Sequence, residues 1–240
     1  MPTSKNKTSD KVFPTIKAIA FDLDDTLLDT SGLLVPQAAR QACQKLLDAG
    51  LKCDLQTCLD YRAKKALHMS HTEIFPEIAQ KFGPLDQEDV QKAVDAFYIP
   101  QLPDSLPIFS GALENLQKLH PHYILYVVTM GHKATQLQKI KSLGIGHFFK
   151  NIYVLDNVKK ERKETAFLEI LRQENITPSE LLSFGNRLSA EIRDAKKIGA
   201  TACHFIYGEH ADEKPSSVFD APDVTITNHS EFISACQLLD

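Results

Sequence analysis

The sequence has no excess of basic residues, no long apolar run and no closely paired cysteines. Its 27 lysines and arginines stand against 31 aspartates and glutamates, so the formal net charge is −4. Because nucleic-acid binding relies on a basic surface that neutralises phosphates, this balance argues against a nucleic-acid partner. No apolar run approaches the roughly 20 residues of a membrane span, and the first residues contain no apolar signal core. We therefore expect a cytoplasmic protein that acts on small molecules, without a membrane partner.

The cysteines are few, and their spacing suggests no bridge. Their number is odd, and no two of them form a C-x-x-C motif. Disulfide frameworks and most structural zinc sites depend on paired cysteines, so neither is expected here. We expect reduced thiols, mostly buried. The five positions are Cys43, Cys53, Cys58, Cys203 and Cys236.

What the sequence does contain is a succession of short apolar segments, each stopped by polar residues or glycine. Strands that are buried on both faces of a parallel sheet have this pattern. Segments with helical spacing lie between them, such as residues 112–120 and 133–143. Strands that alternate with helices predict an α/β fold with a doubly wound parallel sheet, in which ligands bind at the carboxyl ends of the strands. The predicted strands are residues 17–23, 123–129, 151–155, 181–185 and 201–206.

One long stretch interrupts the alternation of strands and helices. Between residues 33 and 107 the apolar residues follow helical spacing, and no segment has a convincing strand pattern. Prolines cluster at the end of this stretch, which suits a stiff hinge back to the sheet. We expect residues 33–107 to form an inserted helical subdomain, residues 13–32 and 108–240 to form the α/β core, and residues 1–12 to form a flexible tail.

The first predicted strand ends in a cluster of acidic residues. Asp22 and Asp24 are two positions apart, and residues at this spacing in an extended segment point to the same side. The two carboxylates would therefore project into one crevice. Because like charges so close together need a cation or a shared proton, we expect a hard metal ion such as Mg²⁺ beside them. A solvated acidic turn is the alternative interpretation, which the buried strand before it disfavours.

The run Asp22-Leu23-Asp24-Asp25-Thr26 resembles the first motif, D-x-D-x-[TV], of the haloacid dehalogenase-like (HAD) superfamily, whose phosphatases use an aspartate as the nucleophile. Three later segments resemble the other motifs of this superfamily, in the same order along the chain. They are an apolar strand that ends at Thr129, a lysine at a helix start, and an apolar strand followed by Asn186 and Glu191. For the lysine, the spacing to Asn186 favours Lys163 over Lys160.

The fourth motif departs from the family pattern, which has Asp where this chain has Asn186. An amide oxygen can ligate Mg²⁺ but contributes no charge. We therefore expect weaker metal binding unless Glu191 compensates.

The resemblance implies a mechanism through an aspartyl-phosphate. In it, Asp22 would attack phosphorus, and Asp24 would act first as general acid and then as general base. Lys163 would add positive charge beside the phosphoryl group. The implied catalytic residues are Asp22, Asp24, Thr129 and Lys163; the implied substrate-binding residues are Thr129, Met130, Gly131 and Lys163, the glycine and methionine through their backbone amides; the implied Mg²⁺ ligands are Asp22, Asp24, Asn186 and Glu191.

The function implied by the resemblance is Mg²⁺-dependent hydrolysis of a small phosphate monoester. Asp24 favours a phosphatase over a dehalogenase, because a halide leaving group needs no proton. The helical insertion resembles the C1-type cap of phosphoglycolate-phosphatase-like and 5′-nucleotidase-like members. Two alternatives remain open: a phosphomutase, and a phosphoryl-ligand binding or regulatory protein whose activity is weakened or lost through Asn186. Basic residues of the insertion, among them Arg62 and His71, either meet a second anionic group of the substrate or form a solvated helix face.

Overall fold

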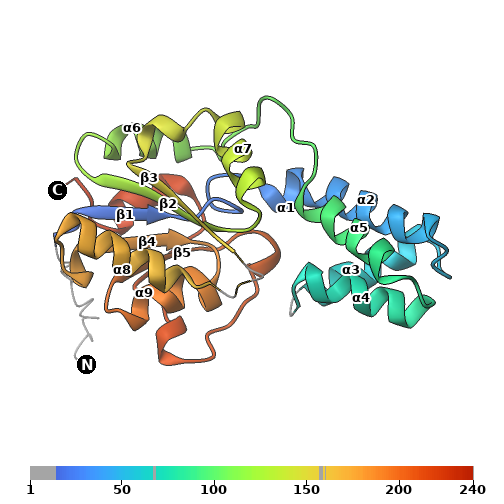
Figure 1. Ribbon diagram of the computed structural model, residues 1–240. Coiled ribbons are helices and arrows are strands. Elements are labelled where there is room, and N and C mark those ends of the chain that lie inside the picture. Colours follow the sequence, from blue (N-terminus) through green and yellow to red (C-terminus); the bar gives the residue numbers. More distant parts are fainter. Residues whose placement is uncertain (1–14, 67–68, 157–158, 160, 240) are drawn as a thin grey trace, which may run out of the picture.

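The computed structural model of the protein describes residues 15–66, 69–156, 159 and 161–239. The expected tail at residues 1–12 and the alternative lysine, Lys160, lie outside the described residues. Within them, helices cover both faces of a parallel sheet, and a separate helical lobe stands beside it (Figure 1). The predicted α/β class and the doubly wound sheet are confirmed.

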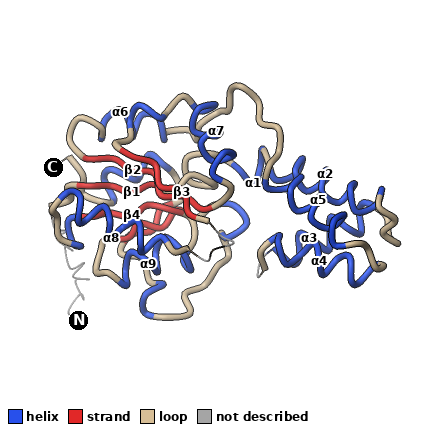
Figure 2. The backbone as a smooth tube through the Cα atoms, viewed as in Figure 1, coloured by secondary structure: helices blue, strands red, loops and turns tan. Residues whose placement is uncertain are grey.

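The sheet is six-stranded and parallel throughout. Its strands are β1 (Ala18–Phe21), β2 (Ile124–Met130), β3 (Asn151–Leu155), β4 (Leu181–Gly185), β5 (Thr201–Phe205) and β6 (Val224–Ile226). They follow the order β3-β2-β1-β4-β5-β6, so that β1 lies in the middle, between β2 and β4 (Figure 2). The sequence pattern predicts the first five strands. It does not predict β6, because three residues are too few to show an apolar run.

Helices connect the strands and also fill the long segment after β1. The helices predicted at residues 112–120 and 133–143 are confirmed. Between residues 33 and 107, the described part of the chain contains helices and no strand. The helices are α1 (Thr30–Leu33), α2 (Val35–Asp48), α3 (Leu55–Ala66), α4 (His71–Phe82), α5 (Gln87–Tyr98), α6 (Ala112–Leu119), α7 (Lys133–Leu143), α8 (Lys163–Glu174), α9 (Arg193–Lys197) and α10 (Phe232–Ala235).

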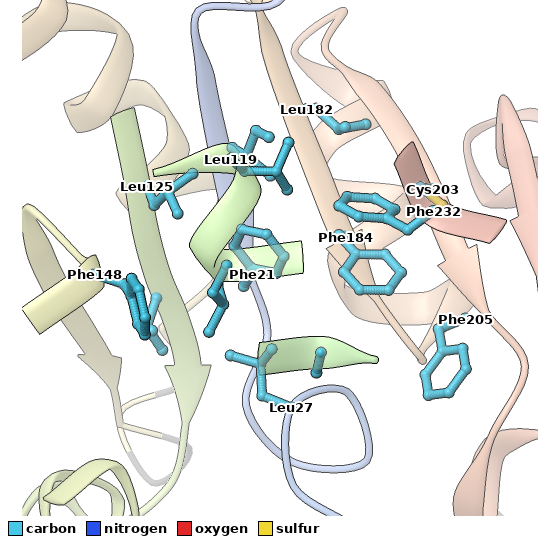
Figure 3. Close-up of a cluster of buried hydrophobic side chains, with 14 of the residues drawn as sticks. Phe21, Leu27, Leu119, Leu125, Phe148, Leu182, Phe184, Cys203, Phe205 and Phe232 are labelled. Carbon is cyan, nitrogen blue, oxygen red and sulfur yellow. The ribbon is translucent and has the colours of Figure 1, made fainter. Parts of the chain in front are cut away.

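Alternate residues of the strands pack on opposite faces of the sheet. In β1, Ile19 and Phe21 join a cluster that includes residues of α6, α7 and α10, whereas Ala18 and Ala20 join a cluster with residues of α8 and α9. The first cluster is rich in aromatic rings that surround Phe21 (Figure 3). Because both faces are covered, most strand residues are apolar, which explains the short apolar runs in the sequence.

Helices α2 to α5 form the lobe and have a hydrophobic core of their own. Fully buried Ile74, Phe75 and Ile78 of α4 lie in this core. The chain enters the lobe directly after β1 and leaves it before α6 (Figure 1). The lobe therefore stands at the carboxyl ends of the central strands, where the fold class places ligands.

All five cysteines are free thiols, as predicted, and all but Cys53 are buried. None of the helices in the described residues combines the length and the apolar character that a bilayer crossing needs.

Candidate active site

A cavity of about 250 Å³ lies at the carboxyl ends of β1, β2 and β4, between the sheet and the lobe. Its wall includes each residue that the sequence predicts for the site. These residues come from four separate segments of the chain, and the parallel sheet brings them together because its strands all end at the same edge. The predicted residues that line the cavity are Asp22, Asp24, Thr129, Met130, Gly131, Lys163, Asn186 and Glu191.

Lys163 is the centre of a buried ion network. Its Nζ lies 2.5 Å from Asp22 Oδ1 and also contacts Glu191 Oε1. The side chains of all three residues are more than nine-tenths buried. Removing Lys163 from this network would leave two buried carboxylates without their shared cation. The network therefore holds both carboxylates at fixed positions beside the strand ends.

The pKa of Asp22 is raised to about 7. Burial is the main cause, Lys163 opposes it, and the neighbouring carboxylates of Glu191 and Asp24 add to it. Burial alone would lower the pKa of Lys163, but Asp22 and Glu191 outweigh this effect and raise it above its ordinary value. Without a further cation, Asp22 thus holds its proton well above the pH at which a solvated aspartate loses it.

Local structure explains how these side chains are positioned. Asp22 follows β1 directly, and its backbone N–H donates to Phe184 O of β4 over 2.9 Å. Lys163 is the first residue of α8, and its helix start is held by the ion pair between Arg162 and Asp194. Gly185 ends β4 beside Glu191, where a Cβ would lie only 2.3 Å from Glu191 Cγ. Only glycine therefore leaves room for the Glu191 side chain.

Glu191 lies in a wide π-helical turn, Leu188–Ile192, that precedes α9. Glu213 binds the backbone N–H groups of Leu188 and Ser189 at the start of this turn, over 2.8 Å and 3.1 Å. Single π turns occur often at functional sites because they redirect a side chain. Here the turn carries Glu191, which reaches Lys163 with one oxygen and accepts from the backbone N–H of Arg187 with the other.

A Mg²⁺ ion requires several oxygen atoms near one point. The Asn186 amide nitrogen donates to Tyr207 O over 3.2 Å, which leaves the amide oxygen as the atom available to a cation. Asp22 and the main-chain carbonyl of Asp24 supply further oxygens. Within the described residues, no three His, Cys, Asp or Glu side chains form a metal cluster. With an amide and a main-chain carbonyl among the donors, the residues present fit a weakly charged Mg²⁺ site.

Asp24 is held by three donors that the sequence analysis does not predict. Thr30 Oγ1 donates to Asp24 Oδ1 over 2.5 Å, and Lys139 Nζ lies 2.6 Å from the same oxygen. Gln136 Nε2 donates to Asp24 Oδ2 and to Thr129 Oγ1, each over 2.7 Å. Burial would raise the pKa of Asp24, but Lys139, Thr30 and Gln136 together lower it below its ordinary value.

A signal for these residues does exist in the sequence. Gln136 and Lys139 are three positions apart on α7, just after Thr129, and a helix presents residues at this spacing on one face. Both are buried, which is rare for these residue types unless they are paired. Their carboxylate partner, however, is more than 100 positions away, at 112 and 115 residues respectively.

One predicted contact is corrected by the structure. The backbone N–H of Gly131, expected to hold a phosphoryl oxygen, instead donates to Leu155 O over 2.9 Å. The reason is that β2 continues to Met130 and pairs with β3 up to Leu155. The hydrogen bonds between the two strands therefore include the N–H of the next residue, Gly131. Gly131 adopts a φ of 142°, which is open to glycine and strained for other residues.

Sequence comparison relates the chain to a known family of hydrolases. The sequence profile of the family described as "Haloacid dehalogenase-like hydrolase" matches residues 19–205. A protein of Methanopyrus kandleri named glyceraldehyde 3-phosphate phosphatase is 30% identical over 237 residues, which span 93% of this chain and 98% of the relative. A protein of Photorhabdus laumondii named phosphoglycolate phosphatase is 24% identical over 234 residues and is covered to 95%, as is this chain.

A solved structure of the HAD-hydrolase YfnB from Bacillus subtilis, bound to magnesium, has the same fold. It matches with a TM-score of 0.67 at 21% identity, over 94% of this chain and 100% of that chain. The profile covers most of the chain, and the Methanopyrus kandleri relative is similar over nearly its full length. The chain therefore belongs to the haloacid dehalogenase-like hydrolase family.

Proposed function

We propose that this protein is a Mg²⁺-dependent phosphatase that hydrolyses a small phosphate monoester through an aspartyl-phosphate on Asp22. The observation that carries the proposal is the convergence of Asp22, Asp24, Lys163 and Asn186 on one cavity at the strand ends. Relatives named as phosphatases for glyceraldehyde 3-phosphate and phosphoglycolate support the same reaction class.

In the first step, an Asp22 oxygen forms a bond to phosphorus while the bond from phosphorus to the ester oxygen breaks, and Asp24 protonates the leaving alcohol. In the second step, Asp24 takes a proton from a water molecule that attacks phosphorus, and the bond to Asp22 breaks to release phosphate. The ion pair with Lys139 favours the ionised form of Asp24 that this second step needs. In the first step, the negative charge of the bound phosphate opposes Lys139 and favours the protonated form of Asp24.

Three groups of the chain serve the phosphoryl oxygens. Lys163 supplies positive charge, and Thr129 supplies a hydroxyl that Gln136 holds in place. Mg²⁺, when bound by Asp22, the Asp24 carbonyl and Asn186, would neutralise charge between the phosphate dianion and the nucleophile. Glu191 acts on this site through its ion pair with Lys163.

The cavity and the neighbouring lobe favour a small substrate. A volume of about 250 Å³ accommodates a phosphate ester of a few carbon atoms. Lobes at this position act as lids in many enzymes, where closure excludes water during phosphoryl transfer. Triose phosphates and phosphoglycolate, the substrates in the relatives' names, are of this size.

A phosphate-release assay tests the proposal directly. Purified protein would be incubated with glyceraldehyde 3-phosphate, phosphoglycolate and a pyrimidine 5′-monophosphate, with Mg²⁺ or with a chelator. We expect release of inorganic phosphate from at least one ester, and only with the metal. If no ester is hydrolysed with Mg²⁺ or Mn²⁺, the binding-protein alternative is favoured; a rearranged phosphate ester in place of free phosphate would indicate a mutase.

Restoring the missing charge of the fourth motif should strengthen metal binding. In Asn186→Asp, a carboxylate replaces the amide, and its added attraction for Mg²⁺ is expected to tighten the dissociation constant about tenfold or more. The variant also loses the hydrogen bond to Tyr207 O, so without metal it should melt at a slightly lower temperature than the wild type. Calorimetric titration with Mg²⁺ measures the affinity. An Asn186→Ala control should weaken it, and an affinity unchanged in both variants would remove Asn186 from the ligand set.

Magnesium binding should depend on pH through Asp22. With a pKa of about 7, Asp22 carries a proton below neutral pH, and the metal must displace it. We expect the apparent Mg²⁺ affinity to fall by about tenfold for each pH unit below 7 and to level off above 8. Titration calorimetry in two buffers of different ionisation enthalpy would detect the released proton. An affinity that is flat between pH 5.5 and 8 would contradict this assignment.

A further inference from the structure

The lobe contributes its own wall to the active-site cavity, formed by His71, Phe97 and Tyr98. Arg62 of α3 holds this wall in place, and only 5% of its surface is exposed. Its Nε donates to His71 Nε2 over 2.8 Å, and its guanidinium carbon lies 5.3 Å from the centre of the Phe97 ring. Its Nη1 lies 2.9 Å from Glu209 Oε1, so the same side chain ties the lobe to the loop after β5.

The contact with Arg62 determines where His71 carries its proton. The arginine Nε can only donate, so His71 Nε2 must accept, and the ring proton is therefore on Nδ1. Burial, together with the Arg62 charge, lowers the pKa of His71 to about 3, so the ring is neutral at physiological pH. The ring is stacked on Phe97, with 3.7 Å between the centroids and 18° between the planes. No described residue accepts a hydrogen bond from Nδ1, which leaves one oriented N–H donor on a residue of the cavity wall.

Two basic residues of the lobe, Arg62 and Lys65, form ion pairs with carboxylates of the protein. Arg62 is paired with Glu209, and Lys65 of the same helix is paired with Glu77 over 2.6 Å. Arg187, the exposed arginine of the cavity lining, belongs to the sheet side, next to Asn186 in the chain. Burial of Arg62 excludes the solvated helix face that the sequence leaves open for it. Its Nη1 is paired with Glu209, and its buried Nη2 has no partner among the described residues.

We propose that His71 determines specificity by donating a hydrogen bond from Nδ1 to an uncharged oxygen, a hydroxyl or a carbonyl, on the non-phosphate end of the substrate. Arg62 is the positioning residue that fixes this donor. The inference rests on the proposed phosphatase function, which puts the phosphate at the sheet side of the same cavity. The substrate class is a short phosphorylated polyol or sugar whose distal end is uncharged.

Two substrates that differ only in their hydroxyl groups test this role. Glycerol 3-phosphate and propyl phosphate would be compared with the wild type, with His71→Phe, which keeps a ring but has no N–H, and with His71→Asn, whose amide can replace the Nδ1 donor. We expect His71→Phe to raise KM for glycerol 3-phosphate about tenfold, with kcat and the propyl phosphate kinetics changed less than about twofold. His71→Asn should recover most of the loss.

Variants of Arg62 and of its partner Glu209 test whether Arg62 positions His71. Glu209→Gln leaves the lobe side chains unchanged. It should raise KM for glycerol 3-phosphate but not for propyl phosphate, and by less than His71→Phe does. Arg62→Met should do the same, and its melting temperature reports whether the buried position still folds. Equal effects on both substrates in His71→Phe, or none on either, would overturn the inference. If wild-type protein hydrolyses neither ester, calorimetric binding of the two esters decides the inference separately, and equal affinities, or no binding, overturn it. The proposed function itself fails only if the esters of the phosphate-release assay are not hydrolysed either.

Discussion

Asp22→Asn is expected to abolish phosphate release, with kcat lowered by at least about 10³-fold. The amide is a poor nucleophile and cannot form the aspartyl-phosphate. Among the carboxylates of the described cavity lining, Asp22 combines the contact with Lys163 with a position directly after the central strand β1. Asp24 is held by Lys139 and Gln136, and Glu191 is held by Lys163 and the Arg187 amide. Neither can take over without rearrangement.

The same variant should fold at least as well as the wild type. The pKa of Asp22 is raised from 3.8 to about 7 in the folded protein, so the folded state loses stability as the pH rises from 3.8 to 7. The full cost is present above pH 7, where Asp22 is ionised and buried. Asparagine removes this cost, so in metal-free buffer at pH 8 the variant should melt at the same or a higher temperature.

These two measurements separate chemistry from folding. Loss of turnover with a retained or raised melting temperature supports the nucleophile role. A variant that still releases phosphate at more than about one-tenth of the wild-type rate would exclude Asp22 as the nucleophile. Mass spectrometry of wild-type protein quenched in acid during turnover should also find a phosphoryl group that Asp22→Asn lacks.

Lys163→Met is expected to have the largest effect on stability. It leaves the carboxylates of Asp22 and Glu191 buried and facing each other without their shared cation. Removing one partner of a buried ion pair typically costs about 3–5 kcal/mol of the free energy of unfolding. The loss should be greatest at pH 8 and smaller at pH 5.5, because protonation of a carboxylate then relieves the repulsion. Activity should fall by about 10²-fold or more, since the charge beside the phosphoryl group is lost.

Lys133→Met offers a matched control. Lys133 is the first residue of α7, as Lys163 is of α8, but it is exposed. Its replacement should change the free energy of unfolding by less than about 0.5 kcal/mol. Urea denaturation of both variants in metal-free buffer at the two pH values gives the comparison. Equal stability of the two variants at pH 8 would show that the network around Lys163 contributes little.

Much of the site was predictable because its residues are defined by short-range patterns. Asp22 and Asp24 stand at the end of an apolar strand, and their spacing of two is enough to put both on one side. Thr129, Lys163 and Asn186 likewise follow predicted strands or begin a helix. In a parallel sheet such positions meet at one edge, so the sequence predicts the group of residues without any knowledge of the distances between them.

The contacts within this group were less predictable. Gly131 was expected to bind phosphate through its amide, but the β2–β3 ladder extends far enough to use that N–H. Glu191 was expected among the metal ligands, and its oxygens contact Lys163 and the Arg187 amide. Sequence spacing does not reveal which neighbour is near enough to contact such a group. The assignment of Glu191 as a metal ligand stays a prediction.

The sequence by itself determined the α/β class, the order of the first five strands along the chain and the residues that gather at their ends. These features depend on apolar periodicity and on turns, which involve neighbours in the chain. Only the tertiary structure decided that Gln136 and Lys139 hold Asp24 and that Arg62 joins His71 to Glu209. Buried charged and polar groups must find partners wherever packing brings them, and those partners lie far apart in the sequence.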